Sequence, residues 1–109
     1  MKLVFIYQPI TDVEAAVPFY RDELGWEEAW REGAETVAFW MPGRAAQVML
    51  STTDQPAGPM YLVESLLAWM AEHPDIDITI PPYDIPGGTV AGLTGPGGNI
   101  FYVYDQPNA

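Results

Sequence analysis

Hydrophobic and polar positions follow one series of patterns in the first half of the chain and repeat that series in the second half. β-Branched and aromatic residues dominate residues 2–10, a segment too short for an independent helix, so a strand is predicted there. Apolar residues then recur at helical spacing over 13–24, with Asp12 as a candidate N-cap and Gly25 as a stop. This spacing predicts an amphipathic helix. Pro18 lies inside it, where the missing N–H should kink the helix or confine its regular part.

The remaining elements are predicted from alternation and turn residues. Three more strands of the first half are predicted at 26–31, 35–41 and 46–52. In the second half, Ser65 caps a helix that Pro74 ends. The strands of that half are predicted at 60–63, 75–80, 89–94 and 99–105, with a loop at 81–88. A turn-rich linker at about 52–58 separates a first module at about 1–53 from a second at about 58–109.

An internal repeat supports this division into two modules. Thr36-Val37-Ala38 recurs as Thr89-Val90-Ala91 at an offset of 53, and Pro42-Gly43 recurs as Pro96-Gly97 at an offset of 54. The predicted helix caps Asp12 and Ser65 are related by the same shift. A common offset near half the chain length indicates that each half holds a strand, a helix and three strands.

Composition then excludes several kinds of partner. Fifteen carboxylates and four cations give a net charge of −11, so the chain lacks the basic surface that nucleic acid or an anionic membrane requires. No run of 18 apolar residues is present, so no membrane span is expected. Cysteine is absent, which excludes disulfides and thiolate metal sites and agrees with a cytoplasmic location.

Two segments resemble a known family. "ITDVEAAVPFYRDELGWE" at 10–27 places an acid and an alanine-rich helix before Phe19-Tyr20-Arg21-Asp22 and Leu24-Gly25. "GPGGNIFYVYD" at 95–105 resembles the closing signature of that family, with Gly95 where an aspartate is usual. The chain is therefore similar to the vicinal oxygen chelate superfamily of glyoxalase I, ring-cleaving dioxygenases and bleomycin-binding proteins. The resemblance implies an α+β fold of two βαβββ modules, whose curled mixed sheet surrounds a cleft, and commonly a homodimer.

The resemblance also implies where metal ligands stand in the metal-dependent members, on the first and fourth strands of each module. These positions correspond here to Phe5 and Met49 in the first module and to Gly58 and Tyr102 in the second. None supplies the imidazole or carboxylate that holds a divalent metal. The single histidine, His73, lies in the last turn of the second helix, where a structural role is expected. We therefore expect neither a metal nor another cofactor.

Apolar and aromatic residues at these positions predict an apolar, aromatic cleft. Glu28 is expected between the indoles of Trp26 and Trp30, where it would attract a cation. The candidate ligand-binding residues are Phe5, Tyr7, Glu28, Trp30, Trp40, Met49, Met60, Tyr102 and Tyr104. No residue is assigned a catalytic role.

The favoured hypothesis is a metal-free binding protein that sequesters a hydrophobic, aromatic or cationic small molecule, as drug-binding resistance proteins of the family do. One alternative is a metal-independent isomerase or lyase that uses Tyr7, Tyr102 or a carboxylate as acid or base. Another is a degenerate module that acts as an oligomeric or regulatory partner. The missing ligand set favours binding over catalysis.

Overall fold

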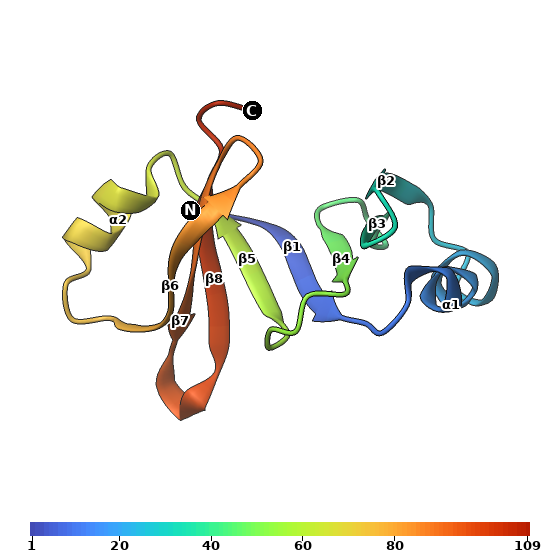
Figure 1. Cartoon of the computed structure of the whole chain (residues 1–109), viewed down its shortest axis with the longest axis horizontal. Helices are drawn as coiled ribbons and strands as arrows, with labels where there is room; N and C mark the ends of the chain where they lie inside the picture. The colour runs from blue at the N-terminus through green and yellow to red at the C-terminus, as the bar shows by residue number, and fades with distance from the viewer. The chain divides into compact units, whose positions relative to one another are not determined.

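The computed structural model describes residues 1–109 and divides the chain into two compact units (Figure 1). Module one is Val4–Ala57, and module two is Gly58–Ala109 together with Met1–Leu3. Each module holds a strand, a helix and three strands in that order. The predicted α+β class with two βαβββ modules is therefore confirmed.

Module one is a four-stranded mixed sheet with one short helix. Its strands are ordered β2-β3-β4-β1, with β1 parallel to β4 and the other pairs antiparallel. The elements are β1 (Lys2–Pro9), α1 (Val13–Pro18), the π-helical turn η1 (Phe19–Glu23), β2 (Glu28–Glu32), β3 (Thr36–Trp40) and β4 (Gln47–Ser51).

Helix α1 begins where the sequence predicts and ends earlier. Asp12 is the N-cap, and its Oδ1 accepts a hydrogen bond from the Glu14 backbone N–H at 3.1 Å. Pro18 confines the regular part of the helix, because it has no N–H to continue the α-helical bonding pattern. The chain continues as a wider π-helical turn, in which the Leu24 N–H donates to the Phe19 carbonyl at 3.0 Å.

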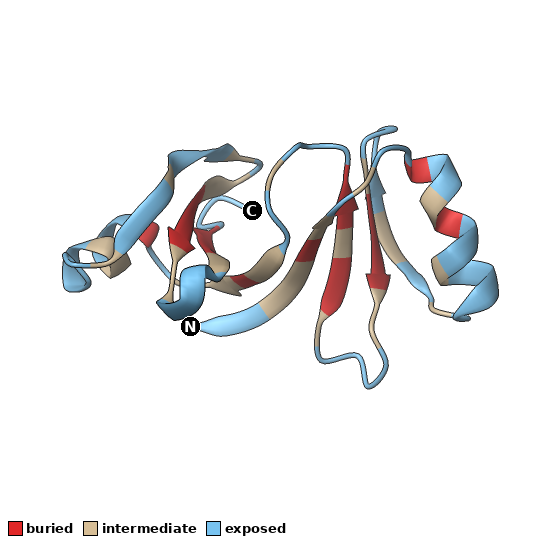
Figure 2. Cartoon of the chain, turned by 90° about the horizontal axis from the view of Figure 1, so that it is seen from below, coloured by how far each residue is buried: buried red, intermediate tan, exposed pale blue.

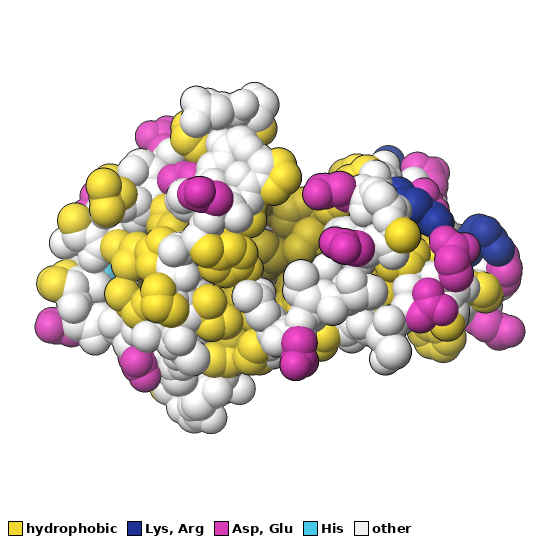
Figure 3. All heavy atoms as spheres, viewed as in Figure 1, with side chains coloured by type: hydrophobic (Ala, Val, Ile, Leu, Met, Phe, Trp, Pro, Cys, Tyr) yellow, Lys and Arg dark blue, Asp and Glu magenta, His cyan; other side chains and the backbone are white.

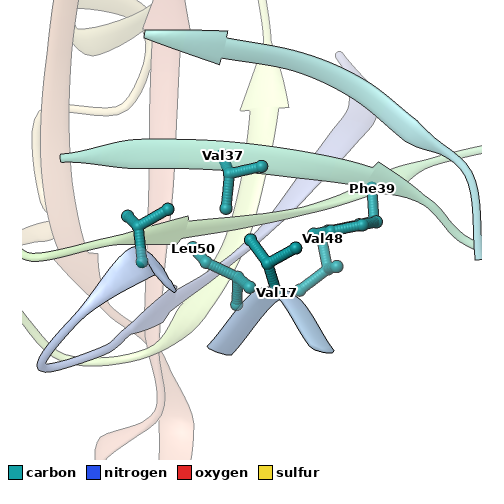
Figure 4. Packing of buried hydrophobic residues seen from close by; sticks show 6 residues of the cluster. Val17, Val37, Phe39, Val48 and Leu50 are labelled. Carbon is teal, nitrogen blue, oxygen red and sulfur yellow. The ribbon is translucent and has the colours of Figure 1, made fainter. Parts of the chain in front are cut away.

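The core of module one lies between α1 and one face of its sheet. Figure 2 shows the buried bands on α1 and on the strands of the module. Figure 4 shows the aliphatic side chains and the ring of Phe39 pointing toward one another across this interface. The buried members of the cluster are Val13, Val17, Val37, Phe39, Val48 and Leu50. Burying such a side chain contributes about 1.5–3 kcal/mol, so this face carries most of the apolar stabilisation of the module.

Module two repeats the plan, with strand order β5-β8-β7-β6 and with β5 parallel to β8. Its elements are β5 (Gly58–Leu62), α2 (Leu66–Glu72), β6 (Asp77–Ile85), β7 (Gly88–Thr94), the 3-10 turn η2 (Pro96–Gly98) and β8 (Ile100–Asp105). Ser65 caps α2 as predicted, with its Oγ accepting from the Ala68 N–H at 3.2 Å. Neither helix of the structure has the length and apolar character needed to span a membrane.

Strand β6 corrects one prediction. The sequence predicts a loop from residue 81, whereas the strand continues through Pro81 and Pro82 to Ile85. Prolines are tolerated here because β6 is an outer strand of its module and pairs with β7 alone, with irregular register between Ile78 and Tyr83. The missing N–H groups therefore remove no essential ladder bond.

The last strand, β8, is launched by glycines and ends on a buried carboxylate. The φ angles of Gly97 and Gly98 are +78° and +77°, a left-handed conformation that glycine adopts without steric cost. At the other end, Asp105 is buried, and its Oδ2 accepts from the Leu66 N–H at the start of α2 at 2.6 Å. Its Oδ1 accepts from the Thr89 N–H and hydroxyl at 3.0 and 3.2 Å. Asp105 therefore ties α2 and β7 to β8.

Replacing Asp105 should destabilise the fold more than replacing Asp12, the aspartate that caps α1. We expect Asp105→Ala to lower the free energy of unfolding by about 2–3 kcal/mol, because it leaves buried donors without a charged acceptor. Asp12→Ala, which removes an exposed cap, should cost about 1 kcal/mol. Urea unfolding followed by circular dichroism measures both. Equal losses in the two variants would contradict the role assigned to Asp105.

Candidate functional site

The candidate site lies on the face of module one's sheet opposite α1. Strand register places Phe5 of β1 beside Gln47 of β4, and Gln47 beside Trp40 of β3. Paired residues of neighbouring strands point to the same side of a sheet. Because the residues that alternate with these, such as Val48, face α1, this row of side chains lies on the other face.

The Trp30 side chain extends over this face from β2, which lies at the other edge of the module's sheet from β1. Trp30 on β2 pairs with Ala38 on β3, whose small side chain leaves room for the indole. The indole Nε1–H donates to Gln47 Oε1 at 2.8 Å, and the ring meets Phe5 edge to face with centroids 6.0 Å apart. An aromatic pair of this geometry contributes about 0.5–1.5 kcal/mol beyond its buried area. Residues from β1, β2 and β4 are thereby joined in one cluster, which we call the Trp30 cluster: Phe5, Trp30 and Gln47.

The Gln47 amide has a defined orientation. An indole N–H can only donate, so the amide atom that faces it must be the oxygen. Gln47 is 9% exposed, which makes it one of few polar side chains among the buried residues. The phenyl and indole rings beside it are half-buried. The arrangement is a flat, fixed aromatic surface with one amide set into it.

Tyr7 borders this cluster through a separate polar group. Its hydroxyl donates to the Thr53 carbonyl at 2.6 Å and lies 2.8 Å from Thr53 Oγ1. Thr53 Oγ1 in turn donates to Ser51 Oγ at 3.3 Å. The buried Tyr7 ring therefore anchors the segment that follows β4, which is a structural task for the phenol.

Trp40 lies at the other end of the row. The guanidinium of Arg44 stands over its ring, 4.5 Å from the centroid, in a cation–π contact. Such a contact contributes about 0.5–1 kcal/mol at an exposed site. Arg44 thus covers one face of the Trp40 indole, and Met49 is half-buried two residues along β4 from Gln47.

The prediction that Glu28 lies between two indoles is wrong. Irregular pairing between Glu28 and Trp30 interrupts the alternation of β2, so Glu28 pairs with Phe39, a residue of the α1-facing core. Trp26 packs against that same core, while Trp30 lies on the other face. The bulge therefore separates Glu28 from the Trp30 cluster.

Glu28 instead forms an ion pair with Arg31. Its Oε1 lies 2.8 Å from Arg31 Nη2, and Arg31 Nη1 lies 2.8 Å from Glu14 Oε1 on α1. Exposed pairs of this kind are screened by solvent and contribute little to stability. Glu28 thus belongs to a group of ion pairs that includes Glu14 of α1. It is therefore not the cation-binding carboxylate between two indoles that the sequence predicted.

The candidate residues of module two gather on the corresponding face of its own sheet. Met60 of β5 lies beside Tyr102 of β8, and Tyr104 lies beside Leu62 one step further. Met60, Tyr102 and Tyr104 are all buried. Burial raises the pKa of Tyr104 to about 12, so its phenol stays protonated at neutral pH.

The positions implied for metal ligands do not fit a divalent cation. Register places Phe5 beside Gln47 and Tyr7 beside Met49 in module one, and Met60 beside Tyr102 in module two. The side chains at these positions are aromatic rings and a thioether, and the oxygen of the neighbouring Gln47 amide already accepts a hydrogen bond from Trp30. Across residues 1–109, no three His, Asp or Glu side chains are grouped closely enough to hold an ion.

Two other features lie apart from the Trp30 cluster. His73 follows α2, where its Nδ1 lies 2.7 Å from the Trp69 carbonyl oxygen and its ring stacks on the Trp69 indole at 4.2 Å. Module two also contains a hollow of about 420 Å³, lined by Met1, Leu62, Val63, Glu64, Gln106 and Pro107. None of the residues predicted to bind ligand lines this hollow.

Sequence reasoning missed the roles of Gln47, Thr53 and Asp105. Gln47 could have been found from alternation, because it precedes Met49 by two residues and must share its face. The bond to Trp30 could not, since it joins β2 to β4 across β3. The only sequence feature that marks Asp105 is its position as an acidic residue at the end of an apolar strand, and this feature does not predict its bonds to α2 and β7.

The comparisons with known proteins assign the chain to a family. A family model described as the glyoxalase/bleomycin resistance protein/dioxygenase superfamily matches residues 2–103, so the chain belongs to this superfamily. No curated protein matches it.

Solved structures share the fold at low sequence identity. One described as an NAD-dependent benzaldehyde dehydrogenase from Legionella pneumophila superposes with a TM-score of 0.74 at 12% identity, over 94% of this chain and 97% of that one. A methylmalonyl-CoA epimerase gives 0.65 at 16% identity, over 99% and 97%. A superfamily member from Vibrio splendidus 12B01 gives 0.61 at 19% identity, over 95% and 97%. At these identities the likeness concerns the fold alone.

The raised pKa of Tyr104 predicts a loss of stability in alkali. The unfolded chain ionises this phenol from a pKa near 10, whereas the folded chain holds the proton until about 12, so the unfolding free energy falls as pH rises between those values. Between about pH 9 and pH 11, the wild type should lose about 1 kcal/mol more than Tyr104→Phe. Urea unfolding at the two pH values measures this difference, and identical losses would show that Tyr104 is not desolvated.

Proposed function

We propose that the chain is a metal-free binding protein that sequesters a small molecule with a flat apolar ring, held against the Trp30 cluster of module one. The observation that carries this proposal is the half-buried Phe5–Trp30 pair, fixed edge to face beside a buried amide. Binding sites for small molecules are commonly apolar and aromatic surfaces with a few well-placed polar groups. Of the remaining candidates, Tyr7, Trp40 and Met49 lie on the same face of module one and border the proposed site. Met60, Tyr102 and Tyr104 belong to module two, and their role in ligand binding stays a prediction.

The fixed geometry of Trp30 supports binding. A side chain held by a hydrogen bond at 2.8 Å and by a ring contact loses little freedom when a ligand arrives. The apolar area that a ligand covers contributes about 25 cal/mol per Å². A flat ring that stacks on the indole therefore gains burial at a low entropic cost.

The charge of the protein selects among such ligands. The net charge is −11, and Figure 3 shows acidic side chains spread over the visible surface, with the visible cations near α1 and β2. An anion would approach against this field, so neutral and cationic ligands are favoured. Because Glu28 is paired with Arg31, any preference for cations comes from the overall charge.

Acid–base catalysis has weaker support than binding. The Tyr7 hydroxyl is committed to Thr53, and Asp105, the one carboxylate among the buried residues, is committed to α2 and β7. A general base needs a free lone pair within reach of a substrate proton. These commitments favour a binding role for the aromatic surface.

Titration with two planar probes of opposite charge tests the proposal. N-Methylquinolinium should bind and raise the melting temperature, and 2-naphthalenesulfonate should bind more weakly, with a gap that narrows as salt is added. Trp30→Ala should weaken N-methylquinolinium at least tenfold, because it removes the stacking surface. Isothermal titration calorimetry measures each affinity.

Trp26→Phe is the matched control, since Trp26 belongs to the same module but packs on the α1 side of the sheet. It should leave both affinities unchanged. No heat from either probe, or equal weakening by the changes at Trp26 and Trp30, would contradict a binding surface at the Trp30 cluster.

The proposal includes a homodimer in the cytoplasm. The dimer follows from the family resemblance, and the lack of cysteine agrees with a reducing compartment. Light scattering during size-exclusion chromatography should give twice the chain mass of 12.1 kDa. A mass equal to that of one chain across a range of concentrations would refute the dimer.

A further inference from the structure

The orientation of Gln47 decides which ligand group its amide can meet. The indole of Trp30 occupies Oε1, the only acceptor of the side chain, at 2.8 Å. What remains is Nε2 with its two N–H donors. The indole already covers one lone pair of Oε1, whereas both Nε2 hydrogens lack a protein partner, so Gln47 meets a ligand mainly as a donor.

The free end of the amide reaches accessible space. Gln47 makes no side-chain hydrogen bond besides the one from Trp30. No buried side-chain nitrogen or oxygen of the protein lacks a partner, so Nε2 is not sealed within the core. A donor on a side chain that is only 9% exposed gains more from a ligand acceptor than an open surface donor would, because the surroundings are poorly solvated.

The neighbours of Gln47 determine where such a ligand lies. Phe5 and Trp40 flank Gln47 in the same row of the sheet, and the Trp30 indole reaches it from β2. A ligand oxygen bonded to Nε2 would therefore leave the attached ring against aromatic surface. Carboxylates also accept hydrogen bonds, but the net charge of −11 disfavours them.

We infer that Gln47 is the specificity-determining residue of the site and selects aromatic ligands that carry a neutral carbonyl oxygen, which accepts a hydrogen bond from Nε2. This inference rests on the proposed function. It goes further by naming the polar group of the ligand and the atom that recognises it. Trp30 is the positioning residue, because its N–H holds the amide with the donors outward.

Two probes of equal size and shape test the inference: 2-acetylnaphthalene, which has a carbonyl oxygen, and 2-isopropenylnaphthalene, in which a CH₂ group replaces that oxygen. The wild type should bind the ketone about tenfold more tightly, the effect of one net hydrogen bond in a poorly solvated site. In an NMR titration, the ketone should also move the Gln47 side-chain NH₂ signals further downfield than the hydrocarbon does, because only the ketone accepts a hydrogen bond from them.

Gln47→Glu is the decisive variant. A glutamate at neutral pH still accepts from the Trp30 N–H but has no donor, so the tenfold preference should vanish while 2-isopropenylnaphthalene binds nearly as before. The measured quantity is the ratio of the two dissociation constants. A variant that merely loosens the fold lowers both affinities and leaves this ratio unchanged, and Gln47→Met, which is neutral, should abolish the preference equally.

Gln8→Glu is the matched control. The Gln8 Oε1 also accepts from a ring side chain, the Tyr20 hydroxyl at 3.1 Å, but Gln8 pairs with Leu50 and lies on the α1 side of the sheet. This variant should keep the tenfold preference. If both probes bind the wild type equally, or if Gln47→Glu keeps the preference, the inference is overturned while the binding function stands. If neither probe binds, the proposed function fails as well.

Discussion

The parallel pairing of β1 with β4 is the constraint on which the proposed site depends. It places Phe5 beside Gln47 and, one residue on, Ile6 beside Val48. Because alternate residues point to opposite faces, the same register that delivers Val48 and Leu50 to the α1 core delivers Gln47 to the other face. A slip of one residue would bury the amide under α1 and expose the valine. The energetics of the core and the chemistry of the site are therefore set together.

Module two uses an equivalent parallel pair for a different purpose. Its β5–β8 pair places Tyr61 beside Val103 on the α2 side and buries Tyr102 and Tyr104 on the other. The α2 side also receives Asp105, which bonds the first N–H of the helix. In module one, Asp12 caps α1 locally, and the helix is joined to the sheet by the exposed Glu14–Arg31 ion pair and not by a buried carboxylate. The two modules thus share a topology and differ in how the helix is attached.

Much of the fold could be predicted from alternation, caps and the internal repeat, because those signals are local. Asp12 and Ser65 cap helices as predicted, and each half has the predicted order of elements. The misplaced residues depend on non-local facts. The bulge in β2 moved Glu28 to the α1 face, and no sequence pattern marks it.

The chemistry of the site was harder to predict than its location. The face that holds Phe5, Tyr7 and Met49 follows from period-two alternation. Register between strands far apart in the sequence does not follow from alternation, so the pairing of Phe5 with Gln47 was not predicted. The bond from Trp30 also crosses an intervening strand, and it fixes the amide with its oxygen toward the indole and its NH₂ group free to donate.

Intermolecular nuclear Overhauser effects with bound 2-acetylnaphthalene test this account most directly. We expect contacts from the naphthyl protons to the Phe5 ring and to the Trp30 indole, with the methyl ketone nearest the Gln47 NH₂ protons. Contacts confined to the hollow beside Leu62 and Glu64 in module two, or to the α1 side near Trp26, would contradict it.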